Sequence, residues 1–198
     1  MVSLKHYNQP PGDATAEQMK KLSIIAKQYS HGEIRVTHEQ NLVLPHIKNS
    51  DLFSVWNKLS ALKLATPNIG LITDTICCPG MDYCALATAR SIPISQKISQ
   101  HFKDQSIQDK IGNIKIKISG CINACGHHHV GNIGILGLDR NGEESYQISL
   151  GGSADEKTSI GKIVGPSFSE KELIKAIQTI IKTFETVSYT HLTLPTSR

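Results

Sequence analysis

The 198-residue sequence has no apolar run near the roughly 20 residues that a membrane-spanning helix needs. Its N-terminus lacks the apolar core of a signal peptide, so we expect a cytoplasmic protein with no membrane partner. Aromatic residues make up only 5% of the chain, and the net charge of +4 comes without basic blocks. Both features argue against nucleic acid as a partner, because stacking platforms and basic patches carry such binding.

Cysteine is absent outside positions 77–125, and that stretch holds all five. A disulfide framework would instead spread an even number of cysteines through a small secreted domain. Cys78 and Cys84 are separated by five residues, and Cys121 and Cys125 by three. Four thiolates on two loops can hold zinc or an iron–sulfur cluster, and the long first spacing favours the wider cluster. An enzyme, a haem-free iron–sulfur electron carrier and a structural zinc module remain open at this point.

Residues 1–70 predict a compact unit with the element order β-α-β-β-α, which is typical of a ferredoxin-like half-domain. Thr15 and Gln18 form a capping-box pair before the first helix. Ser50 is positioned to cap a second amphipathic helix, in which Trp56 is expected to lie in the core. The expected strands are 4–7, 34–37 and 42–44.

Residues 71–186 predict an α/β domain that carries the cysteines, so the fold class is α+β. Residues 114–119 alternate apolar and charged side chains, which places Lys115 and Lys117 on a solvent face. Pro93 is expected to interrupt a helix. The expected helices are 85–90, 95–102 and 170–184, and the expected strands are 114–119, 133–138 and 146–150.

Residues 187–198 resemble the translation of a sequencing-library adapter and follow a helix that is still running. We therefore interpret them as a cloning or assembly scar and exclude them from the fold prediction. The expected organisation is a half-domain at 1–70, a cluster-binding domain at 71–186 and this scar.

The segments Cys78-Pro-Gly-Met-Asp-Tyr-Cys84 and Gly120-Cys121-Ile-Asn-Ala-Cys125-Gly126 resemble the cluster signature of the sulfite and nitrite reductase haemoproteins. The resemblance extends over residues 1–184. It implies a [4Fe–4S] cluster on the four cysteines, with Cys125 as the catalytic ligand that bridges the cluster to sirohaem. The second domain would then bind both the cluster and sirohaem.

The same resemblance implies a six-electron reduction of sulfite to sulfide or of nitrite to ammonia. Sulfite is the first choice, because Cys-Cys-Pro-Gly and Gly-Cys-Ile-Asn-Ala-Cys-Gly-His-His-His look most like bacterial sulfite-type members. Ferredoxin or a flavoprotein would donate the electrons. The resemblance covers the second of the family's two pseudo-symmetric halves. The missing N-terminal half, which supplies most substrate-binding arginines and lysines, is therefore an expected partner, and the chain alone is expected to be inactive.

Residues near the motifs also carry predictions. Cys77 is expected to be a buried small hydrophobe, because the spacing of the motif assigns Cys78 as the ligand. Residues 127–129 are three histidines, which we expect to assist near the haem by hydrogen bonding or proton delivery, or to lie in a solvated loop. Arg35, Thr37 and Asn41 either line a sirohaem pocket or form a polar strand face.

Overall fold

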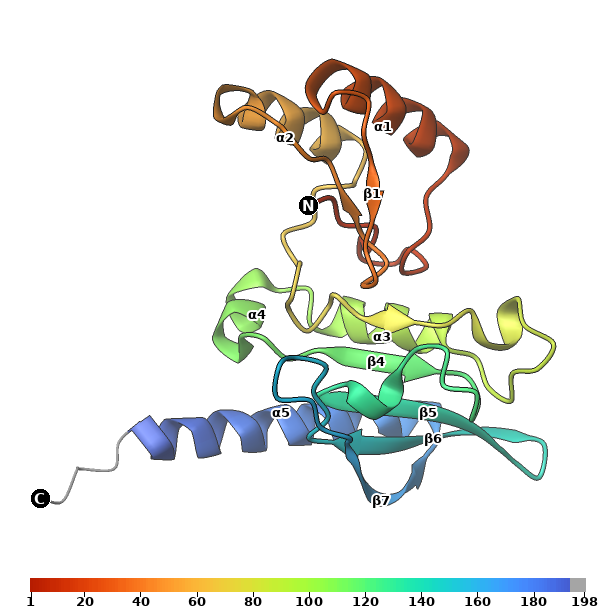
Figure 1. Ribbon diagram of the computed structural model, residues 1–198. Helices are drawn as coiled ribbons and strands as arrows, with labels where there is room; N and C mark the ends of the chain where they lie inside the picture. The colour runs from red at the N-terminus through yellow and green to blue at the C-terminus, as the bar shows by residue number, and fades with distance from the viewer. Residues whose placement is uncertain (193–198) are drawn as a thin grey trace, which may run out of the picture.

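The computed structural model describes residues 1–192, with side chains through residue 187, and contains two packed units (Figure 1). Each unit has its own hydrophobic core: the fully buried apolar residues of the first core end at Leu64, and those of the second begin at Ile72. The α+β class is confirmed. Among the described helices, none combines the length and hydrophobicity that crossing a lipid bilayer requires.

The first unit packs two helices beside a two-stranded antiparallel sheet (Figure 1). Its elements are α1 (Ala16–Tyr29), β1 (Arg35–Val36), β2 (Leu42–Val43), the 3-10 helix η1 (Asn49–Asp51) and α2 (Leu52–Ala61). The predicted capping box is confirmed: the backbone N–H of Gln18 donates to the Thr15 hydroxyl, and that of Thr15 donates to the Gln18 side chain. Leu22 and Ile25 then place one face of α1 in the core.

Three expectations for this unit are wrong. Residues 4–7 form no strand, because buried side chains satisfy the backbone there; for example, Asn41 Oδ1 accepts from the Leu4 N–H. Ser50 does not cap α2, because η1 precedes that helix and the Ser50 hydroxyl donates to Asp51. Trp56 is 52% exposed, since α2 turns Val55 rather than its neighbour toward the core.

The second unit is a mixed five-stranded sheet in the order β3-β4-β5-β6-β7. Its strands are β3 (Ile76–Cys77), β4 (Ile116–Ser119), β5 (Ile133–Arg140), β6 (Glu143–Leu150) and β7 (Lys162–Phe168). The first three strands run parallel, whereas β5, β6 and β7 are antiparallel neighbours. The register places Ile76 beside Lys117 and Ile118 beside Ile135.

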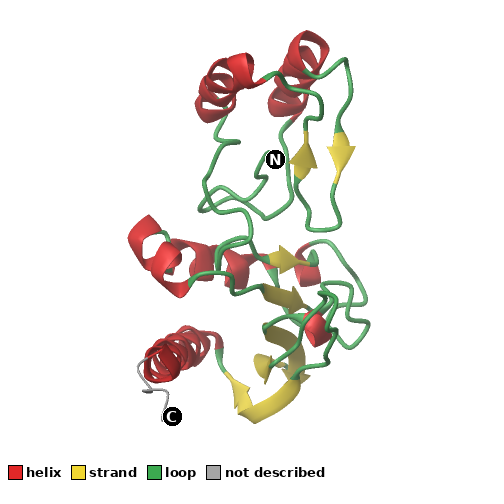
Figure 2. Cartoon of the chain, turned by 60° about the vertical axis from the view of Figure 1, so that its left-hand side comes forward, coloured by secondary structure: helices red, strands yellow, loops and turns green. Residues whose placement is uncertain are grey.

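Helices cover one face of this sheet (Figure 2). They are α3 (Ile92–His101), α4 (Gln105–Ile111) and α5 (Glu170–Leu192). Ile94, Ile98, Leu173 and Ile177 of α3 and α5 are fully buried against the strand isoleucines. The closing helix is confirmed and runs on to Leu192, whereas positions 193–198 of the predicted adapter segment lie outside the described residues.

Other expectations for this unit are also wrong. Residues 85–90 form turns rather than a helix, and Pro93 lies in the first turn of α3, where its missing N–H costs nothing. Lys117 is only 5% exposed, because β4 is a central strand that is buried on both faces. Lys115 pairs with Glu39 of the first unit at 2.7 Å. The sequence patterns did not predict α4 or β7.

A buried ion pair joins the two units. Lys5 Nζ lies 2.7 Å from Asp74 Oδ1, and the two side chains are 1% and 4% exposed. Asn41 Nδ2 and the Gly70 N–H donate to the same carboxylate at 2.9 and 2.8 Å. Burial lowers the pKa of Lys5 from its ordinary value, and the Asp74 carboxylate opposes that shift. The pair therefore depends on its partners to stay charged inside the protein.

Candidate metal centre

Two parallel strands bring the cysteine loops to one edge of the sheet. Cys78 directly follows β3, and Cys121 lies two residues beyond β4. The Cys78 N–H donates to the carbonyl of Ile118 at 3.1 Å, which extends the pairing of β3 and β4 to Cys78. The carboxyl ends of neighbouring parallel strands meet at the same edge, where ligand sites of such sheets commonly lie. The topology therefore places both loops beside each other.

The two loops touch through glycines. A Cβ added to Gly120 would lie 2.9 Å from the Gly80 Cα and 2.7 Å from the Ala89 carbonyl oxygen. The N–H groups of Thr88 and Ala89 donate to the Gly120 carbonyl at 2.9 and 3.0 Å. Gly80 also has a φ of +60°, which favours glycine. Backbone approaches backbone here, so a side chain on either glycine would force the loops apart.

The second loop closes tightly around Cys121 and Cys125. The N–H of Ala124 donates to the Cys121 carbonyl at 3.2 Å, and the N–H of Gly126 donates to the Ser119 hydroxyl at 3.1 Å. A Cβ on Gly126 would lie 1.8 Å from the Ile118 carbonyl oxygen. The glycine after the last cysteine is therefore a steric requirement of the loop.

An acidic residue of β6 holds the first loop from the other side. Glu144 accepts from the backbone N–H of Arg90 at 2.7 Å and from its guanidinium at 2.6 Å. Arg90 Nε lies 3.5 Å from the Asp82 carboxylate inside the Cys78–Cys84 loop. Tyr146 donates its hydroxyl to Glu144 as well. These contacts tie the loop to the β5–β6 hairpin.

The four cysteines differ in exposure. Cys78 and Cys121 are buried, Cys84 is intermediate and Cys125 is exposed. Among the described residues, no three or more His, Cys, Asp or Glu side chains stand together closely enough to hold one metal ion. A zinc ion would need four sulfurs, each about 2.3 Å from one point, whereas an iron–sulfur cube separates its ligands. Four thiolates on two adjoining loops are a donor set that suits an iron–sulfur cluster as well as zinc, and Cys125 is the one on the exposed side.

The Cys78 sulfur already has polar neighbours. The Gly120 N–H donates to Cys78 Sγ at 3.1 Å, and the Ser91 hydroxyl lies 3.4 Å from it. Hydrogen bonds to a coordinating sulfur orient the ligand and adjust the electronic properties of the metal. Sequence reasoning missed Ser91. The sequence did contain a signal for it: a serine two residues before a proline is typical of the start of a helix rather than of a break in one.

Cys77 is a core residue, as predicted. It is 3% exposed and packs among the apolar side chains of the sheet. Burial raises the pKa of the Cys77 thiol well above its ordinary value, and nearby Cys78 adds to this, so the side chain remains a neutral thiol. A neutral buried thiol is a poor metal ligand.

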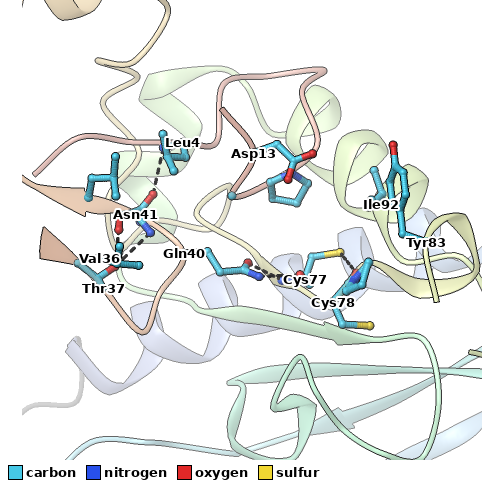
Figure 3. A pocket seen from close by; sticks show the side chains of 14 residues that line it. Leu4, Asp13, Val36, Thr37, Gln40, Asn41, Cys77, Cys78, Tyr83 and Ile92 are labelled. Carbon is cyan, nitrogen blue, oxygen red and sulfur yellow. Dashed lines mark hydrogen bonds between the residues drawn. The ribbon is translucent and has the colours of Figure 1, made fainter. Parts of the chain in front are cut away.

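A cavity of 420 Å³ separates the first unit from the Cys78 loop (Figure 3). Gln40 spans one side: its amide donates to the Cys77 carbonyl at 2.8 Å and accepts from the Cys77 N–H at 3.0 Å. Because β3 is an edge strand, this side chain satisfies backbone groups that would otherwise be free. Sequence reasoning also missed Gln40, which fixes the backbone immediately before Cys78.

Of the three residues expected near a sirohaem pocket, the structure places two at this cavity and one away from it. Thr37 and Asn41 line this cavity together with Cys77 and Cys78. Asn41 is fully buried, and its amide is already engaged by the Leu4 N–H and by Asp74. Arg35 is exposed and pairs with Glu33 at 2.6 Å, outside the lining of the cavity. A sirohaem contact of these residues stays a prediction.

The histidines at 127–129 differ in their exposure to solvent. His127 and His129 are exposed, whereas His128 is 3% exposed, and its Nδ1 has no hydrogen-bond partner within the described residues. The ring centroids of His128 and His129 lie 3.9 Å apart. Burial lowers the pKa of His128 to about 4, and the neighbouring His129 adds to this.

This environment predicts a pH-dependent stability. Below the ordinary pKa of about 6.5 the unfolded chain binds a proton at His128, while the folded chain does not until about pH 4. The free energy of unfolding should therefore fall as the pH drops through this window, by up to about 1.4 kcal/mol per pH unit from this group. Urea unfolding of the metal-free chain at several pH values measures the loss. The variant His128→Leu should lose less stability than wild type between pH 6.5 and 4.5, and equal losses would contradict this account.

Two protein-family models match this chain. A model for the nitrite/sulfite reductase ferredoxin-like half domain matches residues 7–62, and a model for the nitrite and sulphite reductase 4Fe-4S domain matches residues 70–192. The second match covers more than half of the chain. The chain therefore belongs to the nitrite and sulfite reductase family, which confirms the resemblance carried by the cysteine motifs.

Curated relatives include both kinds of reductase. The chloroplastic ferredoxin–nitrite reductase of Spinacia oleracea is 27% identical over 178 residues, covering 87% of this chain and 30% of that protein. The sulfite reductase [NADPH] hemoprotein beta-component of Bacillus licheniformis is 26% identical over 169 residues, covering 82% of this chain and 28% of that protein. This chain thus spans about 30% of the length of such relatives.

Solved structures share the fold. The Mycobacterium tuberculosis NirA protein superposes with a TM-score of 0.76 at 21% identity, over 93% of this chain and 35% of that one. Dissimilatory sulfite reductase I superposes with a TM-score of 0.68 at 12% identity, over 88% of this chain and 61% of that one. The arrangement of half-domain and mixed sheet is therefore a known one.

Proposed function

We propose that Cys78, Cys84, Cys121 and Cys125 hold a [4Fe–4S] cluster and that Cys125 bridges it to sirohaem, in a reductase of sulfite or nitrite. The supporting observation is the meeting of two cysteine loops at the carboxyl ends of β3 and β4, within a chain of the nitrite and sulfite reductase family. The exposure of Cys125 suits the bridging role, because that sulfur must be reached from outside the loops.

The division of labour follows from the residues. When bound, the coupled cluster and haem would pass on, one at a time, the six electrons from the external donor that reduction of sulfite to sulfide or nitrite to ammonia requires, which side chains cannot do. The chain's own residues fix the thiolates, and the Gly120 N–H donates to one of them. We further propose that the cations that bind the anion come from the part of the relatives that this chain does not match, so the chain alone should turn over neither anion.

The identities of the substrate and of the electron donor are also part of this proposal. The relatives' names specify nitrite with ferredoxin and sulfite with NADPH. We propose sulfite as the first substrate, on the motif likeness described above, and ferredoxin or a flavoprotein as the donor. Titrating each anion into the sirohaem-loaded chain joined to the N-terminal half that it lacks, and following the haem absorption, tests this order: tighter binding of nitrite would reverse it.

Reconstitution with iron, sulfide and sirohaem tests the assignment as a whole. We expect the chain to retain both the cluster and the haem absorption through gel filtration, and the Cys125→Ser variant to lose the haem. A cluster without haem would favour the electron carrier. Bound zinc with no sulfide would favour the structural module, which chelators would unfold.

A further inference from the structure

Ser91 lies where the two cysteine loops meet, although it belongs to neither motif. Its side chain is fully buried at the N-terminus of α3, yet it makes no capping hydrogen bond to that helix. Its hydroxyl lies 3.4 Å from Cys78 Sγ, and within the described part of the chain it has no other hydrogen-bond partner. A buried hydroxyl normally has a partner, so this sulfur is the group that satisfies it.

Both loops leave room for this hydroxyl. A Cβ added to Gly80 or to Gly120 would lie 2.9 Å from Ser91 Oγ. One glycine belongs to the loop after β3 and the other to the loop after β4. The hydroxyl therefore fits in a space that each loop provides by lacking a side chain.

The direction of the hydrogen bond follows from the chemistry of the sulfur. A thiolate that binds iron carries no proton, so it accepts, and the Ser91 hydroxyl must donate. The Gly120 N–H donates to the same sulfur at 3.1 Å. Cys78 Sγ thus receives one backbone and one side-chain donor from different segments of the chain.

We propose that Ser91 is a positioning residue that acts through Cys78 to raise the reduction potential of the cluster, an inference that rests on the proposed cluster. Adding an electron makes the cluster more negative, and a donor to its sulfur stabilises that charge. Removing the hydroxyl makes the reduced state less stable relative to the oxidised one. The chain uses Ser91 to make electron uptake easier.

A purely structural role is separable, because α3 offers a matched serine. Ser95 lies one turn further along the same helix, is 1% exposed, and hydrogen-bonds to the hydroxyl of Thr75. The variant Ser95→Ala therefore removes a buried hydroxyl from the same helix without touching Cys78. It measures what loss of packing alone does to the cluster.

Redox titration of the reconstituted chain, followed by electron paramagnetic resonance, tests the proposal. In Ser91→Ala the ratio of reduced to oxidised cluster at a fixed potential should fall roughly threefold to tenfold, as expected for one charge-assisted hydrogen bond. Ser95→Ala should keep the wild-type ratio. Resonance Raman spectra in D₂O add a direct readout: the isotope shift of the iron–sulfur(cysteine) bands should be smaller in Ser91→Ala than in wild type.

The outcomes are distinguishable. Iron and sulfide are measured first, and a wild-type chain without a cluster contradicts the proposed function and this inference with it. A Ser91→Ala chain with full cluster content and the wild-type ratio overturns the role of Ser91 alone, as does an equal shift in Ser95→Ala. If Ser91→Ala holds no cluster, the variant Ser91→Cys replaces it in the test. Its thiol is a weaker hydrogen-bond donor, so the ratio of reduced to oxidised cluster should be lower than in wild type. An unchanged ratio there rejects the proposal.

Discussion

Replacing Asp74 with alanine is expected to lower the free energy of unfolding by about 3 to 5 kcal/mol. The change leaves the Lys5 ammonium, 2.7 Å from this carboxylate in the native chain, buried without its counterion. It also removes the acceptor of Asn41 Nδ2 and of the Gly70 N–H. Unpaired buried donors cost free energy in addition to the lost charge pair.

Urea unfolding of the metal-free variant measures this loss. The matched control is Glu33→Ala, which removes a pair of similar length, 2.6 Å to Arg35, whose side chains are 42% and 58% exposed. Water screens that pair, so the control should change stability far less. Equal effects of the two variants would show that burial does not strengthen the contact between the units.

The second large effect is expected from Gly126→Ala. The new methyl group would lie 1.8 Å from the carbonyl oxygen and 2.6 Å from the carbonyl carbon of Ile118. That carbonyl belongs to β4, which is held by β3 on one side and by β5 on the other, so it cannot move aside. We expect a loss of about 3 kcal/mol or more in unfolding free energy, together with loss of iron binding, because the second cysteine loop cannot close.

A glycine in open space provides the comparison. Gly142, in the β5–β6 turn, has a φ of +86° and nothing within 4 Å of an added Cβ. Gly142→Ala should cost only about 1 kcal/mol from the left-handed backbone and should leave iron binding intact. Retention of iron by Gly126→Ala would contradict the requirement for close backbone contact at the site.

Local signals predicted those parts of the fold that depend on near neighbours. The Thr15–Gln18 box and the closing helix were correct, because each rests on contacts three or four residues apart. Lys117 was wrong for the opposite reason. Its alternation with isoleucines is typical of a half-exposed strand, but β4 is covered on both faces by segments distant in sequence.

The candidate site shows the same limit. The cysteine motifs indicated the residue types and the family, but Gly80 and Gly120 are 40 positions apart in the sequence, which conceals that they touch. The helix expected at 85–90 is instead a turn, whose Ala89 carbonyl accepts from the Met81 N–H of the first loop and lies against Gly120 of the second. Ser91 and Gln40 reach Cys78 and Cys77 only through tertiary structure, and no sequence spacing places them there.

Iron and acid-labile sulfide per chain, after anaerobic reconstitution, test the central claim most directly. Two variants one residue apart make the comparison: Cys78→Ala removes a proposed ligand, and Cys77→Ala removes a buried core thiol. Wild type and Cys77→Ala should each hold about four irons and about four sulfides, and Cys78→Ala should lose the intact cluster. Full cluster content in Cys78→Ala, or one zinc without sulfide in wild type, would contradict the account.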